Sequence, residues 1–372
     1  MRSTLLILLL AASVSAQERF VHSADLSRIS TRKDIAYRNE LKFDLYRPSG
    51  NTVVPIVIFA NRLSADFRTW PIYVGWAQFC AANGLAAVVY QGNENEALIA
   101  FDALVATLKT RASDLAVDAS RIVVWSGSTN VLLGLPVVMD PARDYVRAGV
   151  VYYGSAPVDA FRRDVPLLLV RSGLDSTELD RSIDALIAKA LAANAPWTIE
   201  NYSAGVHGFE VVNDNDVSRA ILERTIAFIH SSLRLSSVYA SQAEAATTGA
   251  AFTRGDWPAA VAGYRRLTAS NPDDAEAHRR LGVALLESNQ FDEALRELER
   301  AYELGRQGVR DTVYRAARAA AGARNIDRTL YWLEMALNSR FGPPIDEVRT
   351  SAAFAPVRDD PRFQQLLVRF SK

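Results

Sequence analysis

Three side chains with complementary chemistry stand at expected loop positions of this sequence: Ser128, Asp175 and His207. An imidazole can take the proton of a serine hydroxyl, and a carboxylate can orient that imidazole and stabilise its charged form. Such a set transfers acyl groups to water through a covalent intermediate on the serine. His207 suits the role of base because Gly205 and Gly208 leave room for an exposed ring. The other histidines precede the predicted fold, lie late in a predicted helix or fall in a repeat region: His22, His230 and His278.

The serine lies in the segment 126–130 (SGSTN), directly after an apolar run at 122–125 and before a second apolar stretch. A strand, a tight turn centred on serine and a helix would expose the hydroxyl and place a helix N-terminus where negative charge develops. Small residues are needed two positions before and after the nucleophile, and here Ser126 and Asn130 replace the usual glycines. Ser126 is small, whereas Asn130 is bulkier and is expected to cap the helix. The alternative is that Ser128 is a helix cap without a catalytic role.

The acid of the set follows an apolar run at 167–170. Catalytic residues of open α/β sheets lie beyond the carboxyl ends of strands, which favours Asp175. Asp180 is the alternative acid, although it resembles the start of the next helix, and Asp175 as a plain turn or cap residue is the other alternative. The order Ser128, Asp175, His207, with separations of 47 and 32 residues, leaves room for strand–helix units in between.

The elements that must position these side chains are apolar runs alternating with helical patterns from about Asp34 to Leu235. Unbroken apolar runs indicate strands buried on both faces of a parallel sheet, and the alternation predicts a doubly wound α/β domain. Residues 41–46 alternate with a period of two, which predicts an antiparallel edge strand ending at Pro48. The other expected strands are 56–59, 85–90, 122–125, 148–153, 167–170 and, more weakly, 199–202. The expected helices are 71–83, 96–111, 131–139, 180–194 and 216–233.

Over about 34–235 the sequence resembles α/β hydrolases of the dienelactone hydrolase-like group. The likeness is carried by LYRP at 45–48, SGSTNV at 126–131, GLD at 173–175 and HGF at 207–209. It implies an α/β-hydrolase sheet, mostly parallel, and a serine triad that needs no cofactor and no metal. Dienelactone hydrolases use a cysteine nucleophile, where this chain has Ser128. The single cysteine, Cys80, lies in a predicted helix and is expected in the core.

The same resemblance implies an oxyanion hole built from the backbone N–H of Thr129 and a second N–H in the loop 60–63, for which Arg62 is our candidate. The family usually has a His-Gly pair in this loop, and this chain does not. A backbone donor needs no particular side chain, but glycine permits close approach. The Arg62 side chain is either an ordinary solvated cation or a contact for an acidic substrate.

Three aromatic residues, Trp70, Tyr73 and Trp76, recur three positions apart near the same loop. They are either a stacking platform for a sugar or aromatic ring, or the face of a helix that packs on the sheet. Packing is the commoner reason for aromatic residues at helical spacing.

Over about 241–340 the strand pattern is absent, and Ala, Leu, Glu and Arg recur at helical spacing. Residues 255–257 (GDW) return 34 positions later at 289–291 (NQF), with a looser third copy at 325–327. This period resembles tetratricopeptide repeats, and a generic helical bundle is the alternative. The segment 354–363 is expected to cap the array. The resemblance implies a surface for a protein partner, a face that docks on the first domain, or a cover for its site.

Residues 1–16 have the pattern of a secretory signal peptide, with Arg2, an apolar run at 5–12 and small residues up to a cleavage site after Ala16. A membrane anchor is the alternative, but a spanning helix needs ~20 apolar residues, and this run is shorter. We therefore expect an exported protein, periplasmic or secreted, with a lead segment at 17–33.

The 372-residue length fits two domains, expected at 34–235 and 236–372. The 42 basic and 42 acidic residues give a net charge of zero, which argues against nucleic acid or an anionic membrane as the main partner. A hydrophobic share of 49% with 23% charged residues is typical of a globular protein. One cysteine excludes an intrachain disulfide.

These patterns predict an exported serine hydrolase that cleaves a small-molecule carboxylic ester through an acyl-enzyme, without stable membrane insertion. The alternative is a catalytically weak or inactive hydrolase-like scaffold that binds a protein partner through its helical repeats. The substituted glycines of the elbow and the unusual loop around Arg62 motivate that alternative.

Overall fold

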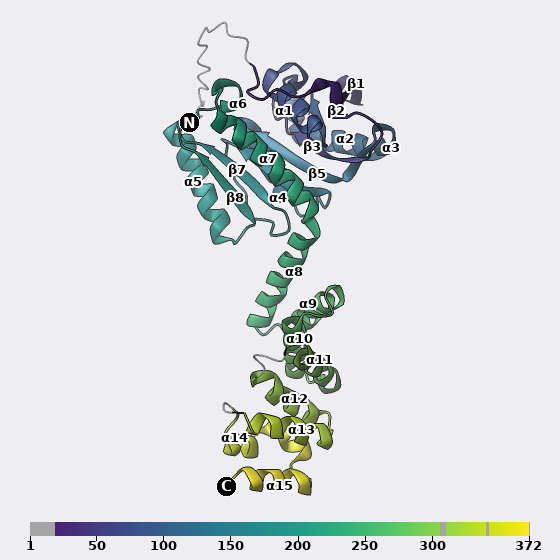
Figure 1. The fold of residues 1–372 in the computed structure, drawn as a ribbon, viewed down its shortest axis with the longest axis vertical. Helices are drawn as coiled ribbons and strands as arrows, with labels where there is room; N and C mark the ends of the chain where they lie inside the picture. Colours follow the sequence, from purple (N-terminus) through teal and green to yellow (C-terminus); the bar gives the residue numbers. More distant parts are fainter. Residues whose placement is uncertain (1–18, 306–309, 340–341, 372) are drawn as a thin grey trace. The chain divides into compact units, whose positions relative to one another are not determined.

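A computed structural model of the protein describes residues 19–305, 310–339 and 342–371. The chain divides into two compact units, the first ending at Tyr239 and the second beginning at Ala240 (Figure 1). The expected signal peptide at 1–16 lies outside the described residues. Among those residues, no helix combines the length and the apolar character that crossing a membrane requires.

The described part of the first unit contains one eight-stranded sheet in the order β1-β2-β4-β3-β5-β6-β7-β8. Its first two pairings, β1 with β2 and β2 with β4, are antiparallel, and all the others are parallel. This is the α/β-hydrolase sheet. The strands are β1 Ile29–Arg38, β2 Leu41–Pro48, β3 Val54–Phe59, β4 Ala86–Tyr90, β5 Val117–Gly127, β6 Val146–Tyr152, β7 Leu167–Ser172 and β8 Trp197–Tyr202.

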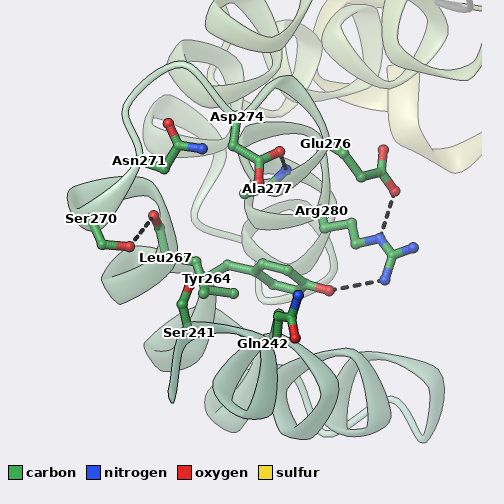
Figure 2. A pocket seen from close by; sticks show the side chains of 11 residues that line it. Ser241, Gln242, Tyr264, Leu267, Ser270, Asn271, Asp274, Glu276, Ala277 and Arg280 are labelled. Carbon is green, nitrogen blue, oxygen red and sulfur yellow. Dashed lines mark hydrogen bonds and ion pairs between the residues drawn. The ribbon is translucent and has the colours of Figure 1, made fainter. Parts of the chain in front are cut away.

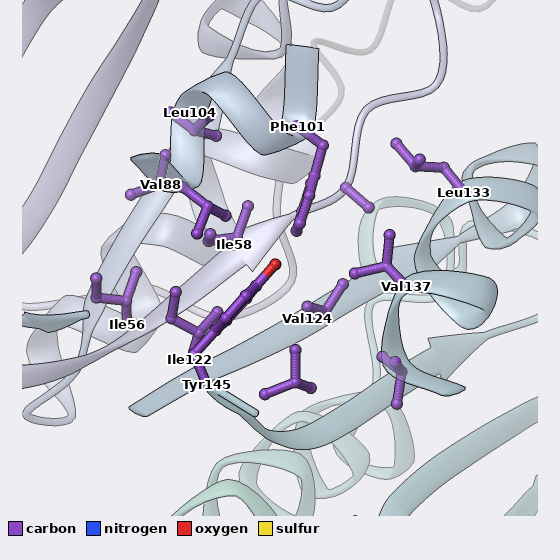
Figure 3. Close-up of a cluster of buried hydrophobic side chains, with 14 of the residues drawn as sticks. Ile56, Ile58, Val88, Phe101, Leu104, Ile122, Val124, Leu133, Val137 and Tyr145 are labelled. Atoms are coloured by element: carbon purple, nitrogen blue, oxygen red, sulfur yellow. The ribbon is translucent and has the colours of Figure 1, made fainter. Parts of the chain in front are cut away.

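Helices cover both faces of this sheet because the central strands are apolar on both sides. One face, drawn in Figure 3, packs Phe101 and Leu104 of one helix and Leu133 of another against Ile56 and Ile58 of β3. The opposite face packs the helices that contain Trp76 and Ile226. The helices of this unit are α1 Pro71–Ala82, α2 Ala97–Thr110, α3 Ala112–Leu115, α4 Val131–Met139, α5 Thr177–Ala192, α6 Phe209–Val212 and α7 Asp216–Arg234.

The predicted α/β alternation is confirmed, and the main difference lies at the beginning of the unit. Strand β1 pairs with the outer side of β2, so the predicted edge strand at 41–46 is antiparallel as expected but does not form the edge. Part of the expected lead segment at 17–33 also belongs to this unit, since Phe20 and Val21 are buried in its core. Local pattern missed β1 because only Ile35 of its ten residues is buried.

The second unit is helical throughout its described residues. Trp257 and Phe291 begin two of its helices, and Ala260 and Ala294, each three positions further on, are fully buried where helices pack on one another. Phe354 and Phe363 of the predicted cap are buried in the same core. The helices are α8 Ser236–Thr253, α9 Trp257–Ser270, α10 Ala275–Glu287, α11 Phe291–Leu304, α12 Arg310–Gly322, α13 Ile326–Leu337, α14 Ile345–Thr350 and α15 Pro361–Phe370, with α8 beginning in the first unit.

Candidate active site

Ser128 lies at a sharp turn between β5 and α4. Strand β5 ends at Gly127, a 3-10 turn covers Ser128–Asn130, and α4 begins at Val131. The backbone φ of Ser128 is 55°, in the left-handed region that non-glycine residues adopt at a cost of about 1–3 kcal/mol. This is the strained elbow that presents a serine hydroxyl at the end of a strand.

Two close approaches explain why small residues are needed at this turn. A Cβ at Gly134 would lie 2.5 Å from the Ser126 side chain, so α4 presses directly on the strand that carries the serine. A Cβ at Gly154 would lie 2.6 Å from the backbone oxygen of Ser128. Ser126 therefore satisfies the size requirement that glycine usually meets.

The structure brings the three predicted side chains together from the ends of β5, β7 and β8. The Ser128 Oγ lies 2.8 Å from His207 Nε2, and His207 Nδ1 lies 2.6 Å from an Asp175 carboxylate oxygen. With the proton on Nδ1, His207 donates to Asp175 and accepts from the Ser128 hydroxyl. The His207 side chain is 43% exposed, whereas that of Asp175 is 9% exposed, so the base faces solvent and the acid lies beneath it.

Asp180, the alternative acid, is engaged elsewhere. Asp180 lies in α5, and its carboxylate pairs with Arg171 of β7 at 3.1 Å. The helix does not begin at Asp180 but at Thr177, with the Ser176 hydroxyl accepting from the Leu179 N–H at its start.

The two expected oxyanion donors differ in availability. Thr129 lies in the 3-10 turn before α4, where the leading N–H groups have no partner within the helix. The Arg62 N–H, in contrast, donates to the side-chain oxygen of Asn130 at 2.9 Å. In this arrangement Arg62 is not an open donor, which corrects our expectation for it.

Asn130 also differs from the expected helix cap. Its side chain makes no capping bond to α4 and instead bridges the Arg62 N–H and the Tyr73 hydroxyl, to which its amide nitrogen donates at 3.0 Å. Asn130 is almost fully buried. A buried amide needs partners for both its donor and its acceptor, and the loop and α1 supply them here.

Sequence reasoning missed Asn61, which holds the loop after β3. Its amide nitrogen donates to the backbone oxygens of Ala65 and Tyr90, both at 2.9 Å, and its oxygen accepts from the Leu63 N–H at 3.0 Å. A polar residue directly after a buried apolar strand is the signal that points to it. Asn61 thus fixes the backbone of the loop in which the resemblance implied a His-Gly pair.

The side chains around this loop also have partners. The Arg62 guanidinium pairs with Glu94 at 3.7 Å, and both groups are exposed. An acidic substrate would therefore compete with Glu94 for Arg62. Of the three aromatic residues, Tyr73 and Trp76 are buried, which favours the packing interpretation for both, and Trp70 is 41% exposed.

A second residue that sequence reasoning missed is Glu210, a fully buried carboxyl three positions after His207. Burial raises its pKa to about 7. No ion pair involves Glu210 in the part of the chain that the structure describes.

Comparisons with known proteins give one family match and several similar solved structures. Residues 250–309 match the tetratricopeptide repeat family. No curated protein matches the chain. Similar solved structures include the esterase Est22 (16% identity, TM-score 0.46, covering 56% of this chain and 82% of that chain) and brefeldin A esterase, a bacterial homologue of human hormone-sensitive lipase (14%, 0.48, 56% and 78%). A bacterial heroin esterase is similar as well (16%, 0.46, 57% and 87%). One fold hosts many activities, so function must be argued from the site.

Proposed function

We propose that this protein is a serine hydrolase that cleaves a carboxylic ester of a small molecule through an acyl-enzyme on Ser128. The observation that carries the proposal is the pair of contacts on one imidazole, 2.8 Å to Ser128 and 2.6 Å to Asp175. The strained φ of Ser128 supports it, because such strain persists where the surrounding structure maintains it, often at functional sites.

In the first half-reaction, His207 Nε2 takes the proton of Ser128 as its oxygen attacks the ester carbonyl. The carbonyl oxygen gains negative charge and accepts a hydrogen bond from the Thr129 N–H. Thr129 lies directly before α4, where the helix dipole favours an anion. The protonated imidazole, held by Asp175, then gives its proton to the alkoxy oxygen. The bond from carbonyl carbon to that oxygen breaks, and the alcohol leaves.

In the second half-reaction, water attacks the acyl-enzyme. His207 takes a proton from the water, and the tetrahedral species collapses to release the carboxylic acid. The proton on His207 returns to Ser128. Both half-reactions use the chain's own residues and require neither a metal nor a cofactor.

Labelling with a fluorophosphonate, together with hydrolysis of p-nitrophenyl acetate, tests the proposal. The wild-type protein should react with the probe and turn over the ester, and Ser128→Ala and His207→Ala should abolish both. His230→Ala is the matched control, because His230 bonds the backbone oxygen of Asn83 on another part of the unit. Folded wild-type protein that neither labels nor turns over ester would refute the proposal.

A second candidate function is a scaffold that binds a protein partner and turns nothing over. The occupied Arg62 N–H and the repeat match at 250–309 favour it. The second unit also has a cavity of about 340 Å³ between helices, where Arg280 donates to the Tyr264 hydroxyl at 3.2 Å and to Glu276 at 2.6 Å (Figure 2). The labelling assay separates the two functions.

Export and the narrower family assignment are also proposals. We propose that residues 1–16 direct export to the periplasm or the medium and that the first unit belongs to the dienelactone hydrolase-like group. N-terminal sequencing of the exported protein should begin at Gln17. Retention of the full chain inside the cell would contradict the proposed export.

A further inference from the structure

Tyr153, the residue after β6, has a strained backbone. Its φ is 32°, in a region that a bulky aromatic residue adopts only when its surroundings enforce it. Its N–H donates to the Val170 oxygen at 2.7 Å, and its side chain is buried. The structure therefore maintains one defined position for this ring.

The Tyr153 ring lies beside the His207 imidazole and close to the residue that precedes Ser128. Its centroid lies 4.5 Å from that of the His207 imidazole, at an angle of 52°. Its Cε2 lies 3.5 Å from where a Cβ would stand on Gly127, the residue directly before Ser128. A shift of the Tyr153 ring would therefore disturb the imidazole and the turn that carries the serine.

The hydroxyl of Tyr153 forms a hydrogen bond with the Glu210 carboxyl. It donates to Glu210 Oε1 at 3.0 Å, and the indole N–H of Trp76 donates to the same oxygen at 3.3 Å. The other oxygen, Oε2, has no hydrogen-bond partner among the described residues. Burial and the negative charge of Glu210 raise the pKa values of Tyr73, Tyr152 and Tyr153.

A buried carboxyl without a cation is expensive to keep. An apolar residue would fill the same space at a lower cost in folding free energy. This cost indicates that the contacts of the Glu210 carboxyl serve a function. Glu210 lies in the short helix α6, which follows His207 and Gly208, and its backbone oxygen accepts from the Val21 N–H at 2.8 Å. The carboxyl is thus anchored on the segment that carries the base.

We infer that Tyr153 and Glu210 are positioning residues for the His207 imidazole, with the Tyr153 ring packed on the imidazole and Glu210 holding the Tyr153 hydroxyl. This inference rests on the proposed hydrolase function. Among the described contacts, neither side chain forms a hydrogen bond with Ser128, Asp175 or His207. Their effect passes through His207, whose ring must remain aligned with Ser128 on one side and Asp175 on the other.

Three variants test the inference. Tyr153→Phe removes only the hydroxyl, and Glu210→Gln keeps the shape and an acceptor while removing the charge. Tyr152→Phe is the matched control, because it also removes a buried hydroxyl, from the residue next to Tyr153. The Tyr152 hydroxyl is bonded to Thr225 at 2.6 Å and not to Glu210. Hydrolysis of p-nitrophenyl acetate is measured at pH 8, where Glu210 is mostly ionised.

We expect Tyr153→Phe and Glu210→Gln each to lower kcat about 10-fold with KM unchanged, because small misplacements of reacting groups cost up to about 100-fold in rate. The double variant should fall no further than Tyr153→Phe, since Glu210 acts through Tyr153. Tyr152→Phe should retain wild-type kcat. Wild-type kcat in both test variants, or losses in the double variant that multiply, would overturn the inference.

NMR of the His207 imidazole supplies a readout that needs no turnover. The chain has four histidines, and His207→Ala assigns the resonances. Because the Tyr153 ring centroid lies 4.5 Å from that of the imidazole, a displacement of either ring changes the ring current at the imidazole protons. The chemical shifts of these protons should therefore change in Tyr153→Phe and Glu210→Gln and stay as in the wild type in Tyr152→Phe. Unchanged shifts in both test variants would refute the positioning role. If the wild-type protein cleaves no ester, the proposed function fails, and these chemical shifts still decide on Tyr153 and Glu210.

Discussion

The side-chain oxygen of Asn130 accepts a hydrogen bond from the backbone N–H of Arg62 at 2.9 Å. Asn130 occupies the position two residues after Ser128, where the resemblance to α/β hydrolases implied a glycine. The bond occupies one of the two donors expected to face the substrate oxyanion. The substitution of the elbow glycine and the altered loop after β3 are therefore linked by one contact.

Replacing Asn130 by alanine should raise activity. The change frees the Arg62 N–H, and one oxyanion donor is worth about 3 kcal/mol in the transition state. We expect kcat on p-nitrophenyl acetate to increase by up to about 100-fold, with KM nearly unchanged. Tyr73→Phe is the control, because it removes the other partner of the amide and leaves the Arg62 bond in place. A lower kcat in Asn130→Ala would mean that the amide holds the loop in its productive position.

Replacing Asp175 by asparagine should lower kcat about 10⁴-fold, because the amide favours the wrong tautomer of the imidazole. Steady-state rates with p-nitrophenyl acetate measure the effect. Asp180→Asn should keep wild-type kcat, since Asp180 pairs with Arg171 and not with His207. Equal losses in the two variants would assign the loss to the structure of the β7–α5 region and not to the relay.

Gly134→Ala should destabilise the first unit. The new methyl would lie 2.5 Å from the Ser126 side chain, and overpacking of this kind costs about 1–3 kcal/mol. Ser126→Gly in the same chain removes the atoms that clash and should restore most of the loss. Urea unfolding of the single and double variants measures the free energy of unfolding. A double variant no more stable than Gly134→Ala would show that the close approach is not the cause.

The stability of the protein should depend on pH through Glu210. Its pKa is raised from 4.5 to about 7 by burial, so the folded protein keeps a proton that the unfolded chain loses in this range. Unfolded protein then binds fewer protons, and the stabilising contribution present below about pH 4.5 is lost as pH rises to about 7.

Glu210→Gln has no such titration. Its free energy of unfolding relative to the wild type should therefore rise by about 3 kcal/mol between pH 4.5 and pH 7.5. Urea unfolding at the two pH values measures this difference. A difference that does not change with pH would show that Glu210 titrates normally in the folded protein.

Most elements of the first unit could be predicted from the sequence because their signals are local. Apolar runs mark the buried strands. Ser128, Asp175 and His207 each lie in a polar segment that follows one of the predicted strands. Strand β1 escaped prediction because it exposes most of its side chains and contributes only Ile35 to the buried core. Its place in the sheet depends on pairing with β2.

The residues proposed as nucleophile, base and acid, and their order along the chain, follow from residue type and position alone, since strand ends of a parallel sheet gather at one edge. The hydrogen-bond partners of the side chains around these three residues cannot be predicted in the same way. Asn130 meets Arg62 across 68 residues and Tyr153 meets Glu210 across 57, through side-chain directions that no local pattern encodes. Folding thus determines which backbone donor is occupied and which buried carboxyl lies behind the base, because these are properties of contacts between distant segments.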